Sequence, residues 1–189
     1  MSVSVPALVG ALVLGYLAGS VSPATLIARA RGVDLRTIGS GNPGATNAGR
    51  ALGRRTGVLV AVLDVAKGAV PAAAFDALDH RAGLAAGVAA VVGHVTSPFL
   101  RGRGGRGVAT AAGAILGVHP VWVVAVLITW VVVLGVSRWV ALASVCAALC
   151  VVAVAVVLQV DVVWAAVLAA VVVVRHQQHF FSRLRPQAS

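Results

Sequence analysis

The chain has 189 residues, of which 60% are hydrophobic and 11% are charged, and its formal net charge is +10. A soluble domain is about 45–50% apolar and about 25% charged, so this composition excludes a water-exposed globular fold. The apolar runs lack the two-residue alternation of an outer-membrane barrel, which leaves membrane-spanning helices. We expect an all-α membrane protein, a polytopic bundle of about seven short transmembrane helices that forms a single domain over residues 1–189.

Seven apolar stretches follow one another along the chain. They cover about residues 5–28, 57–75, 83–100, 108–116, 121–136, 140–158 and 162–174. A helix perpendicular to the bilayer needs about 20 residues to cross it, so the short stretches at 108–116 and 162–174 are expected to be partial spans or to extend into their flanks. Five or six full spans are also compatible with the sequence.

The basic residues are distributed unevenly between the two sides of the predicted bundle. With seven spans, all 15 except Lys67 and Arg81 fall in one set of loops. Lys and Arg accumulate on the cytoplasmic side, so we expect a bacterial plasma (inner) membrane protein with its active-site loops and C-terminus in the cytoplasm. Few aromatic residues lie among the loop arginines, which disfavours nucleic acid as a partner and favours lipid headgroups or small phosphorylated substrates.

The first polar loop reads Gly39-Ser-Gly-Asn-Pro-Gly-Ala-Thr-Asn47 and is followed by Arg50. Glycines let backbone N–H groups approach an anion, and the hydroxyl, amide and guanidinium groups add further donors. The pattern indicates a phosphate cradle, and it is equally compatible with a flexible connection between two spans. The candidate phosphate ligands are Ser40, Gly41, Asn42, Gly44, Asn47 and Arg50.

The second apolar stretch contains an acid and a base, Asp64 and Lys67, three residues apart on one helix face. Charges inside a span are costly and are usually paired or functional. Two interpretations stay open: a buried ion pair that orients helices, or an anion site lined by Lys67.

A glycine–arginine loop precedes the stretch that starts at residue 108. Gly104 and Gly105 allow close backbone approach, and Arg106 stands where a helix is expected to begin. A guanidinium beside helix N-terminal amides can face one anion, so all three are candidate phosphate-binding residues. His94, just upstream, is interpreted as a buried histidine.

Two histidines follow the last stretch, and if the helix continues, His176 and His179 share a face. Their spacing also suits a metal ion, but no Cys, Asp or Glu lies near and the region is strongly basic. We therefore expect no metal site.

Taken in order, these segments resemble the bacterial acyl-phosphate:glycerol-3-phosphate acyltransferase family of small polytopic membrane enzymes. The resemblance implies transfer of a fatty acyl group from acyl phosphate to the 1-hydroxyl of sn-glycerol 3-phosphate, giving lysophosphatidic acid and phosphate, without a cofactor. It implies phosphate contacts at Ser40, Arg50 and Arg106, a catalytic His176, and further substrate contacts at Ser144 and His179. The expected partners are both substrates, membrane lipids and a soluble enzyme that forms acyl phosphate.

Two positions depart from the family pattern. Family members usually carry Lys where this chain has Arg106, and Asn where it has His179. A catalytically impaired paralogue that acts as a scaffold for lipid synthesis therefore stays open as an alternative. A small-anion transporter is another, although it would call for two related halves, and no internal repeat is visible.

Overall fold

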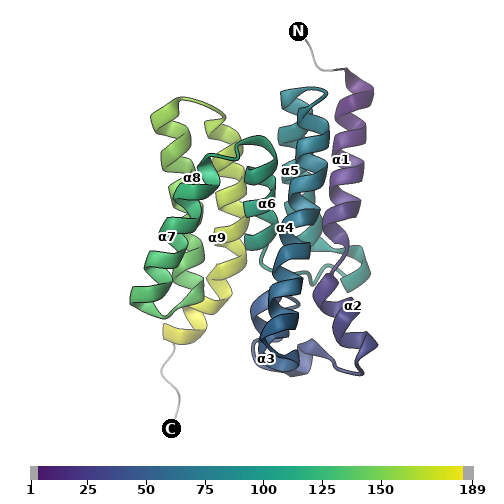
Figure 1. The fold of residues 1–189 in the computed structure, drawn as a ribbon, viewed down its shortest axis with the longest axis vertical. Coiled ribbons are helices and arrows are strands. Elements are labelled where there is room, and N and C mark those ends of the chain that lie inside the picture. The colour runs from purple at the N-terminus through teal and green to yellow at the C-terminus, as the bar shows by residue number, and fades with distance from the viewer. Residues whose placement is uncertain (1–3, 185–189) are drawn as a thin grey trace. The chain divides into compact units, whose positions relative to one another are not determined.

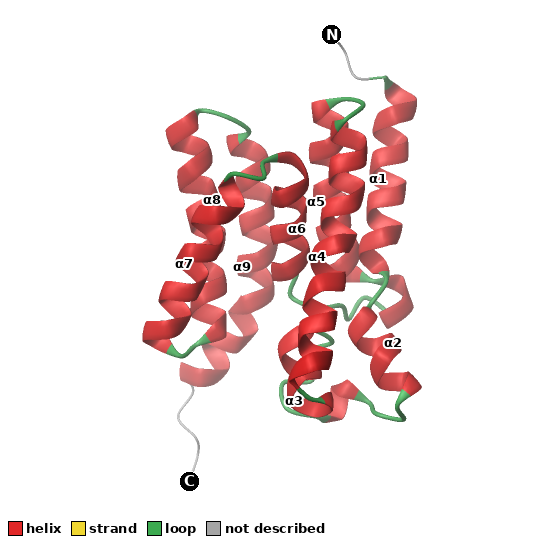
Figure 2. Cartoon of the chain, viewed as in Figure 1, coloured by secondary structure: helices red, strands yellow, loops and turns green. Residues whose placement is uncertain are grey.

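The computed structural model describes residues 4–184, with side chains described through residue 177. Over these residues the chain consists of helices and loops without a strand, as Figure 2 shows, which confirms the expected all-α fold. The α-helices, labelled in Figure 1, are α1 (Val5–Ser20), α2 (Pro23–Ala30), α3 (Ala45–Leu52), α4 (Arg54–Asp76), α5 (His80–Thr96), α6 (Val108–Val118), α7 (Trp122–Ser137), α8 (Val140–Leu158) and α9 (Val162–Leu184). Two 3₁₀ turns, η1 (Leu35–Thr37) and η2 (Pro98–Leu100), complete the described elements.

Seven apolar segments correspond to the seven predicted stretches. Four are long and apolar enough to cross a membrane: Val5–Ala30, Arg54–Asp76, His80–Leu100 and Val140–Leu158. Three shorter apolar helices cover Val108–Val118, Trp122–Ser137 and Val162–Gln177. The stretch at 162–174 therefore extends into its C-terminal flank, whereas the stretch at 108–116 forms an 11-residue helix and is a partial span. This is the arrangement of a multi-pass membrane protein.

The helices group into two compact units, Met1–His119 and Pro120–Ser189, and each unit is described by itself. The single domain over residues 1–189 stays a prediction. In the first unit, α1 packs on α5, while α4 packs on α3, α5 and α6. In the second, α8 packs on both α7 and α9.

The first apolar stretch is interrupted, which the sequence analysis did not anticipate. Helix α1 ends at Ser20, Val21 is extended, and α2 begins at Pro23. The Ser22 hydroxyl caps the new helix by accepting a hydrogen bond from the Thr25 amide at 3.3 Å. Proline disfavours a helical residue before it and tolerates the first helical position, so it starts α2 and separates it from α1.

The predicted polar loop is also shorter than expected. It ends at Gly44, the N-cap of α3, so Asn47 and Arg50 lie on a helix. The sequence from Ala45 to Leu52 has no helix-breaking proline, and Gly53, with a φ of 92°, ends the helix.

Helices α4 and α6 approach each other closely through small residues. A Cβ atom at Gly68 would lie 2.1 Å from the Thr110 carbonyl oxygen, and one at Gly113 would lie 2.0 Å from the Val65 carbonyl oxygen. Small residues allow this backbone proximity between membrane helices. The contact fixes the N-terminal half of α6 beside the stretch of α4 that carries the Asp64–Lys67 pair.

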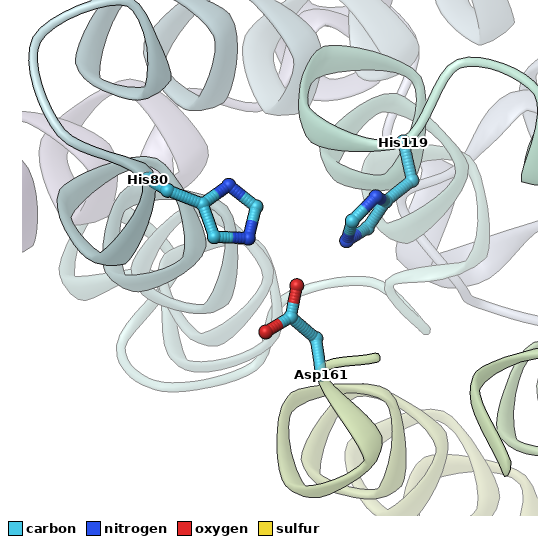
Figure 3. Close-up of side chains that lie close together, drawn as sticks. All are labelled: His80, His119 and Asp161. Atoms are coloured by element: carbon cyan, nitrogen blue, oxygen red, sulfur yellow. The ribbon is translucent and has the colours of Figure 1, made fainter. Parts of the chain in front are cut away.

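The turn between α4 and α5 lies at the upper end of the first unit in Figure 1, opposite α2 and α3. The Asp76 carboxylate is 2.7 Å from His80 Nδ1. The His80 ring meets the His119 ring edge to face, with centroids 5.5 Å apart, as Figure 3 shows. This pair ties the α4–α5 turn to the end of α6.

The second unit is an up-and-down arrangement of three helices. Arg138 and Gln159, both in the left-handed conformation, end α7 and α8 and let the chain reverse. Residues four apart on α8 and α9 supply the buried face, as expected for helices packed along one stripe. These residues are Ala143, Ala147, Val151, Ala155, Trp164, Leu168 and Val172.

Candidate active site

The glycine-rich turn, residues 39–44, is held in shape by Asn47 on the adjoining helix α3. Its side chain is 1% exposed. The Oδ1 atom accepts a hydrogen bond from the Ser40 amide at 3.2 Å, and Nδ2 donates to the Leu35 carbonyl at 2.9 Å. Gly39 and Gly41 have φ angles of 56° and 66°, in the left-handed region that favours glycine. The buried Asn47 amide therefore stabilises a backbone conformation that residues other than glycine would adopt only with strain at positions 39 and 41.

The turn presents polar groups on its outer surface. Ser40 and Arg50 are exposed, and Asn42 is half-buried, whereas Gly44 and Asn47 are buried. Because Asn47 and Arg50 lie three residues apart on α3, the residue that shapes the turn also places the guanidinium beside it. The exposed polar side chains of residues 39–50 are therefore Ser40, Thr46 and Arg50, and Asn47 is buried behind the turn.

A shallow cavity of about 380 Å³ lies between α3 and α4. Gly49 and Gly57 let the helices touch here, since a Cβ at Gly57 would lie 2.8 Å from the Gly49 Cα. Arg50 and Arg54 line this cavity together with small apolar residues. A site of this composition can hold an amphipathic anion, with its charged group on the arginines and its chain on the apolar residues. The full lining is Ala45, Thr46, Gly49, Arg50, Arg54, Gly57, Val58 and Ala61.

Asp64 and Lys67 form the buried ion pair that was one of the two interpretations of their spacing. Lys67 Nζ lies 2.8 Å from Asp64 Oδ1, with side-chain exposures of 9% and 3%. The same ammonium donates a hydrogen bond to the Val21 carbonyl at 2.7 Å. Lys67 is thus turned toward the break between α1 and α2, and its assignment to a substrate phosphate stays a prediction.

The α5–α6 turn, residues 101–107, places Arg106 at the start of α6. The amides of Gly104 and Gly105 donate to the Val95 and His94 carbonyls, each at 3.1 Å. These two N–H groups satisfy the end of α5, whereas Arg106 is only half-buried at the beginning of the next helix. The amides available for an anion are therefore those of the first turn of α6, where the helix dipole also favours negative charge.

The second unit holds the remaining predicted site residues. Ser144 is 2% exposed; its hydroxyl donates to the Val140 carbonyl at 2.8 Å and accepts from Trp130 Nε1 at 3.3 Å. His176 is 1% exposed, with Nδ1 2.7 Å from the Val172 carbonyl. A carbonyl only accepts, so Nδ1 carries the hydrogen and the lone pair of the neutral ring is on Nε2. The side chain of His179 lies outside the described residues.

Two contacts within the first unit were not predicted from the sequence. Arg31 Nη1 donates to Thr56 Oγ1 at 2.9 Å, which joins the end of α2 to the start of α4. Ser97 Oγ donates to the Ser20 carbonyl at 2.6 Å, which joins the end of α5 to the end of α1. No spacing rule connects positions 25 or 77 residues apart, so the sequence alone does not pair these residues.

The chain was compared with known sequences. The profile of a family described as glycerol-3-phosphate acyltransferase matches residues 9–185. A protein of Geotalea daltonii named glycerol-3-phosphate acyltransferase is 47% identical in an alignment of 140 residues that covers 72% of this chain and 72% of that protein. A protein of Deinococcus radiodurans named glycerol-3-phosphate acyltransferase 1 is 44% identical in an alignment of 137 residues that covers 71% of this chain and 69% of that protein.

The chain is also similar to solved structures. A crystal structure of PlsY, described as an integral membrane glycerol 3-phosphate acyltransferase in its glycerol 3-phosphate form, superposes with a TM-score of 0.90 at 34% sequence identity. The match covers 94% of this chain and 92% of that one. Its lysophosphatidic acid form gives a TM-score of 0.88 at 33% identity.

Proposed function

Because the chain belongs to the glycerol-3-phosphate acyltransferase family, we propose that it transfers a fatty acyl group from acyl phosphate to the 1-hydroxyl of sn-glycerol 3-phosphate. The products are lysophosphatidic acid and inorganic phosphate. The family membership confirms the resemblance inferred from the motifs. It supports an enzyme over the scaffold and transporter alternatives, since the relatives are named acyltransferases and similar structures contain glycerol 3-phosphate and lysophosphatidic acid.

The observation that carries the proposal is the turn pinned by Asn47, with Ser40 and Arg50 exposed on its outer side. Acyl phosphate is a mixed anhydride with a good leaving group, so catalysis requires mainly that two mutually repelling anions be positioned. In this proposal, Ser40 and Arg50 bind one substrate phosphate. Arg106 and the backbone amides of the first turn of α6 stabilise the negative charge that develops in the transition state. Fixed donors that face developing charge stabilise a transition state without reorganisation.

The acyl transfer itself forms one bond and breaks another. The 1-hydroxyl oxygen attacks the acyl carbonyl carbon, and the carbon–oxygen bond to phosphate breaks with its electrons on the leaving phosphate. The hydroxyl proton goes to a phosphate oxygen or to Nε2 of His176, the ring atom that carries the lone pair when Nδ1 is bonded to the Val172 carbonyl. Ser144 and His179 are assigned to substrate positioning.

The chain is a multi-pass membrane protein, and we place it in the bacterial plasma (inner) membrane with its active-site loops and C-terminus in the cytoplasm. In the first unit, α2 and α3, together with the arginines that surround them, lie at the lower end in Figure 1, and Arg81 stands at the start of α5 at the upper end. Such an asymmetry supports a cytoplasmic lower end. Acyl phosphate would then come from a soluble cytoplasmic enzyme that forms it.

The test is an assay of purified protein in detergent with palmitoyl phosphate and labelled glycerol 3-phosphate. We expect lysophosphatidic acid with palmitoyl phosphate. A folded protein that makes no product would refute the function. Arg50→Ala should lower kcat/KM by about 10²-fold, as expected when a charged hydrogen bond worth about 3 kcal/mol is lost. Arg81→Ala removes a matched exposed arginine at the opposite end of the unit and should retain the wild-type rate.

A further inference from the structure

Three ionisable side chains of α4 and α5 lie close together in the first unit; Asp64 and His94 are buried, and the Lys67 side chain is 9% exposed. Asp64 is 2% exposed and His94 is 7% exposed. Asp64 Oδ1 lies 2.8 Å from Lys67 Nζ and 3.6 Å from His94 Nδ1, so one carboxylate stands between two nitrogen atoms. Ionisable groups within a membrane bundle are costly to bury and mark functional positions. We call these residues the buried triad.

Lys67 connects the buried triad to the break between α1 and α2. Its ammonium donates to the carbonyl of Val21, the extended residue at which the first span is interrupted. A carbonyl at such a break has left the helical hydrogen-bond pattern and needs another donor. The ammonium supplies it, and the Ser97 hydroxyl does the same for the Ser20 carbonyl. Helices α4 and α5 therefore both hold the break in place.

His94 connects the same triad to the α5–α6 turn. A Cβ atom at Gly105 would lie 2.2 Å from His94 Nε2, so the ring touches the backbone of the turn. The Gly105 amide also donates to the His94 carbonyl at 3.1 Å. The residue after Gly105 is Arg106, at the start of α6. The His94 ring therefore packs against the residue that precedes Arg106, just before α6 begins at Val108.

We propose that Asp64, Lys67 and His94 are positioning residues, whose network joins the α1–α2 break to the α5–α6 turn and holds Arg106 in place for phosphate. The buried triad acts through Arg106 and the first amides of α6, and its members do not contact substrate. This inference rests on the proposed function for the role of Arg106. It differs from the sequence-based assignment of Lys67 as a direct phosphate ligand.

The first test compares kcat and KM for Asp64→Asn, Lys67→Gln, His94→Phe and the charge-neutral double variant Asp64→Asn/Lys67→Gln. A shift of about 1 Å in a positioned group costs about 10²-fold in rate, so we expect each single variant to lose about that factor in kcat. The double variant should lose no more than either single, because one break disables the network. The double variant removes both charges together and so avoids leaving one buried charge without its partner.

Asp76→Asn is the matched control, since it alters a carboxylate–histidine pair of 2.7 Å at the C-terminal end of α4, away from the buried triad. It should keep wild-type kcat and KM. Wild-type rates in the double variant would overturn the proposal. A second result would also overturn it: a raised KM in Lys67→Gln together with wild-type kcat and KM in Asp64→Asn and His94→Phe. Lys67 would then be a substrate ligand.

The second test does not depend on activity. Arg101 and Arg103 are exposed in the α5–α6 turn, and tryptic cleavage there requires the turn to open locally. In the double variant we expect cleavage at these sites to be about tenfold faster, as read by mass spectrometry, with cleavage at Arg54 unchanged. Equal acceleration at every arginine would indicate global destabilisation and would overturn the proposal. An inactive wild type would refute the proposed function and would leave this digestion test intact.

Discussion

Asn47→Ala tests whether one buried amide shapes the anion site. The substitution removes an acceptor 3.2 Å from the Ser40 amide and a donor 2.9 Å from the Leu35 carbonyl. The Leu35 carbonyl would be left buried without a partner, which costs about 1–3 kcal/mol, and the loss of the partly buried bond to the Ser40 amide adds to this cost. We expect the turn to open so that water binds these groups, and this opening displaces Ser40. Each 1.4 kcal/mol corresponds to a factor of ten in affinity, so KM for glycerol 3-phosphate should rise at least about tenfold.

The assay for Asn47→Ala is steady-state kinetics beside a thermal unfolding curve of the same preparation. Thr37→Ala is the matched control: its hydroxyl donates to the Asp34 carbonyl at 3.0 Å, but in an exposed position where water replaces it. It should behave as the wild type in both measurements. A folded Asn47→Ala protein with unchanged KM and kcat would refute the assignment of this turn to substrate.

Three further predictions concern packing and the family departures. Gly68→Ala places a methyl group 2.1 Å from a carbonyl oxygen of α6 and should lower the unfolding temperature and the activity together, whereas Gly135→Ala meets nothing within 4 Å and should be neutral or stabilising. Arg106→Lys keeps the charge and should keep kcat within about tenfold of the wild type, while Arg106→Ala should lose about 10²-fold; equal rates for both would contradict a charge requirement. Ser97→Ala leaves the Ser20 carbonyl without its 2.6 Å donor and should cost about 1–3 kcal/mol in the free energy of unfolding, measured by denaturant titration.

The apolar stretches predicted the number and order of the main helices because a lipid environment demands long apolar runs. Two internal boundaries were missed although the sequence carried signals for them. Ser22 before Pro23 is a helix-start pattern, and Gly53 is a helix-stop residue. Both signals are local, so the rules for helix starts and stops are sufficient to place these two boundaries.

No rule based on local sequence predicts the buried contacts between helices. The pairing of Asp64 with Lys67 follows from their helical spacing, but His94 lies 30 positions beyond Asp64 and joins them only because α5 packs on α4. The Val21 carbonyl, which Lys67 contacts, is 46 positions away. The sequence therefore predicts which residues carry charge in the span, whereas tertiary packing determines which groups each of them contacts.

Glycine at positions 104 and 105 has two possible structural reasons, phosphate binding and helix packing, which the sequence alone does not distinguish. Glycines beside Arg106 predicted close approach of a phosphate, and the structure gives them another reason: a Cβ at Gly104 would lie 1.9 Å from the His94 carbonyl oxygen, and one at Gly105 would meet the His94 ring. Their amides cap α5, so their contribution to phosphate binding is to bring Arg106 and the first turn of α6 close to the end of α5. If that is their role, Gly105→Ala should impair the enzyme by displacing Arg106, and the additional change His94→Ala, which removes the clash but also the positioning ring, should not restore the rate. Full recovery in that double variant would mean that His94 only fills space.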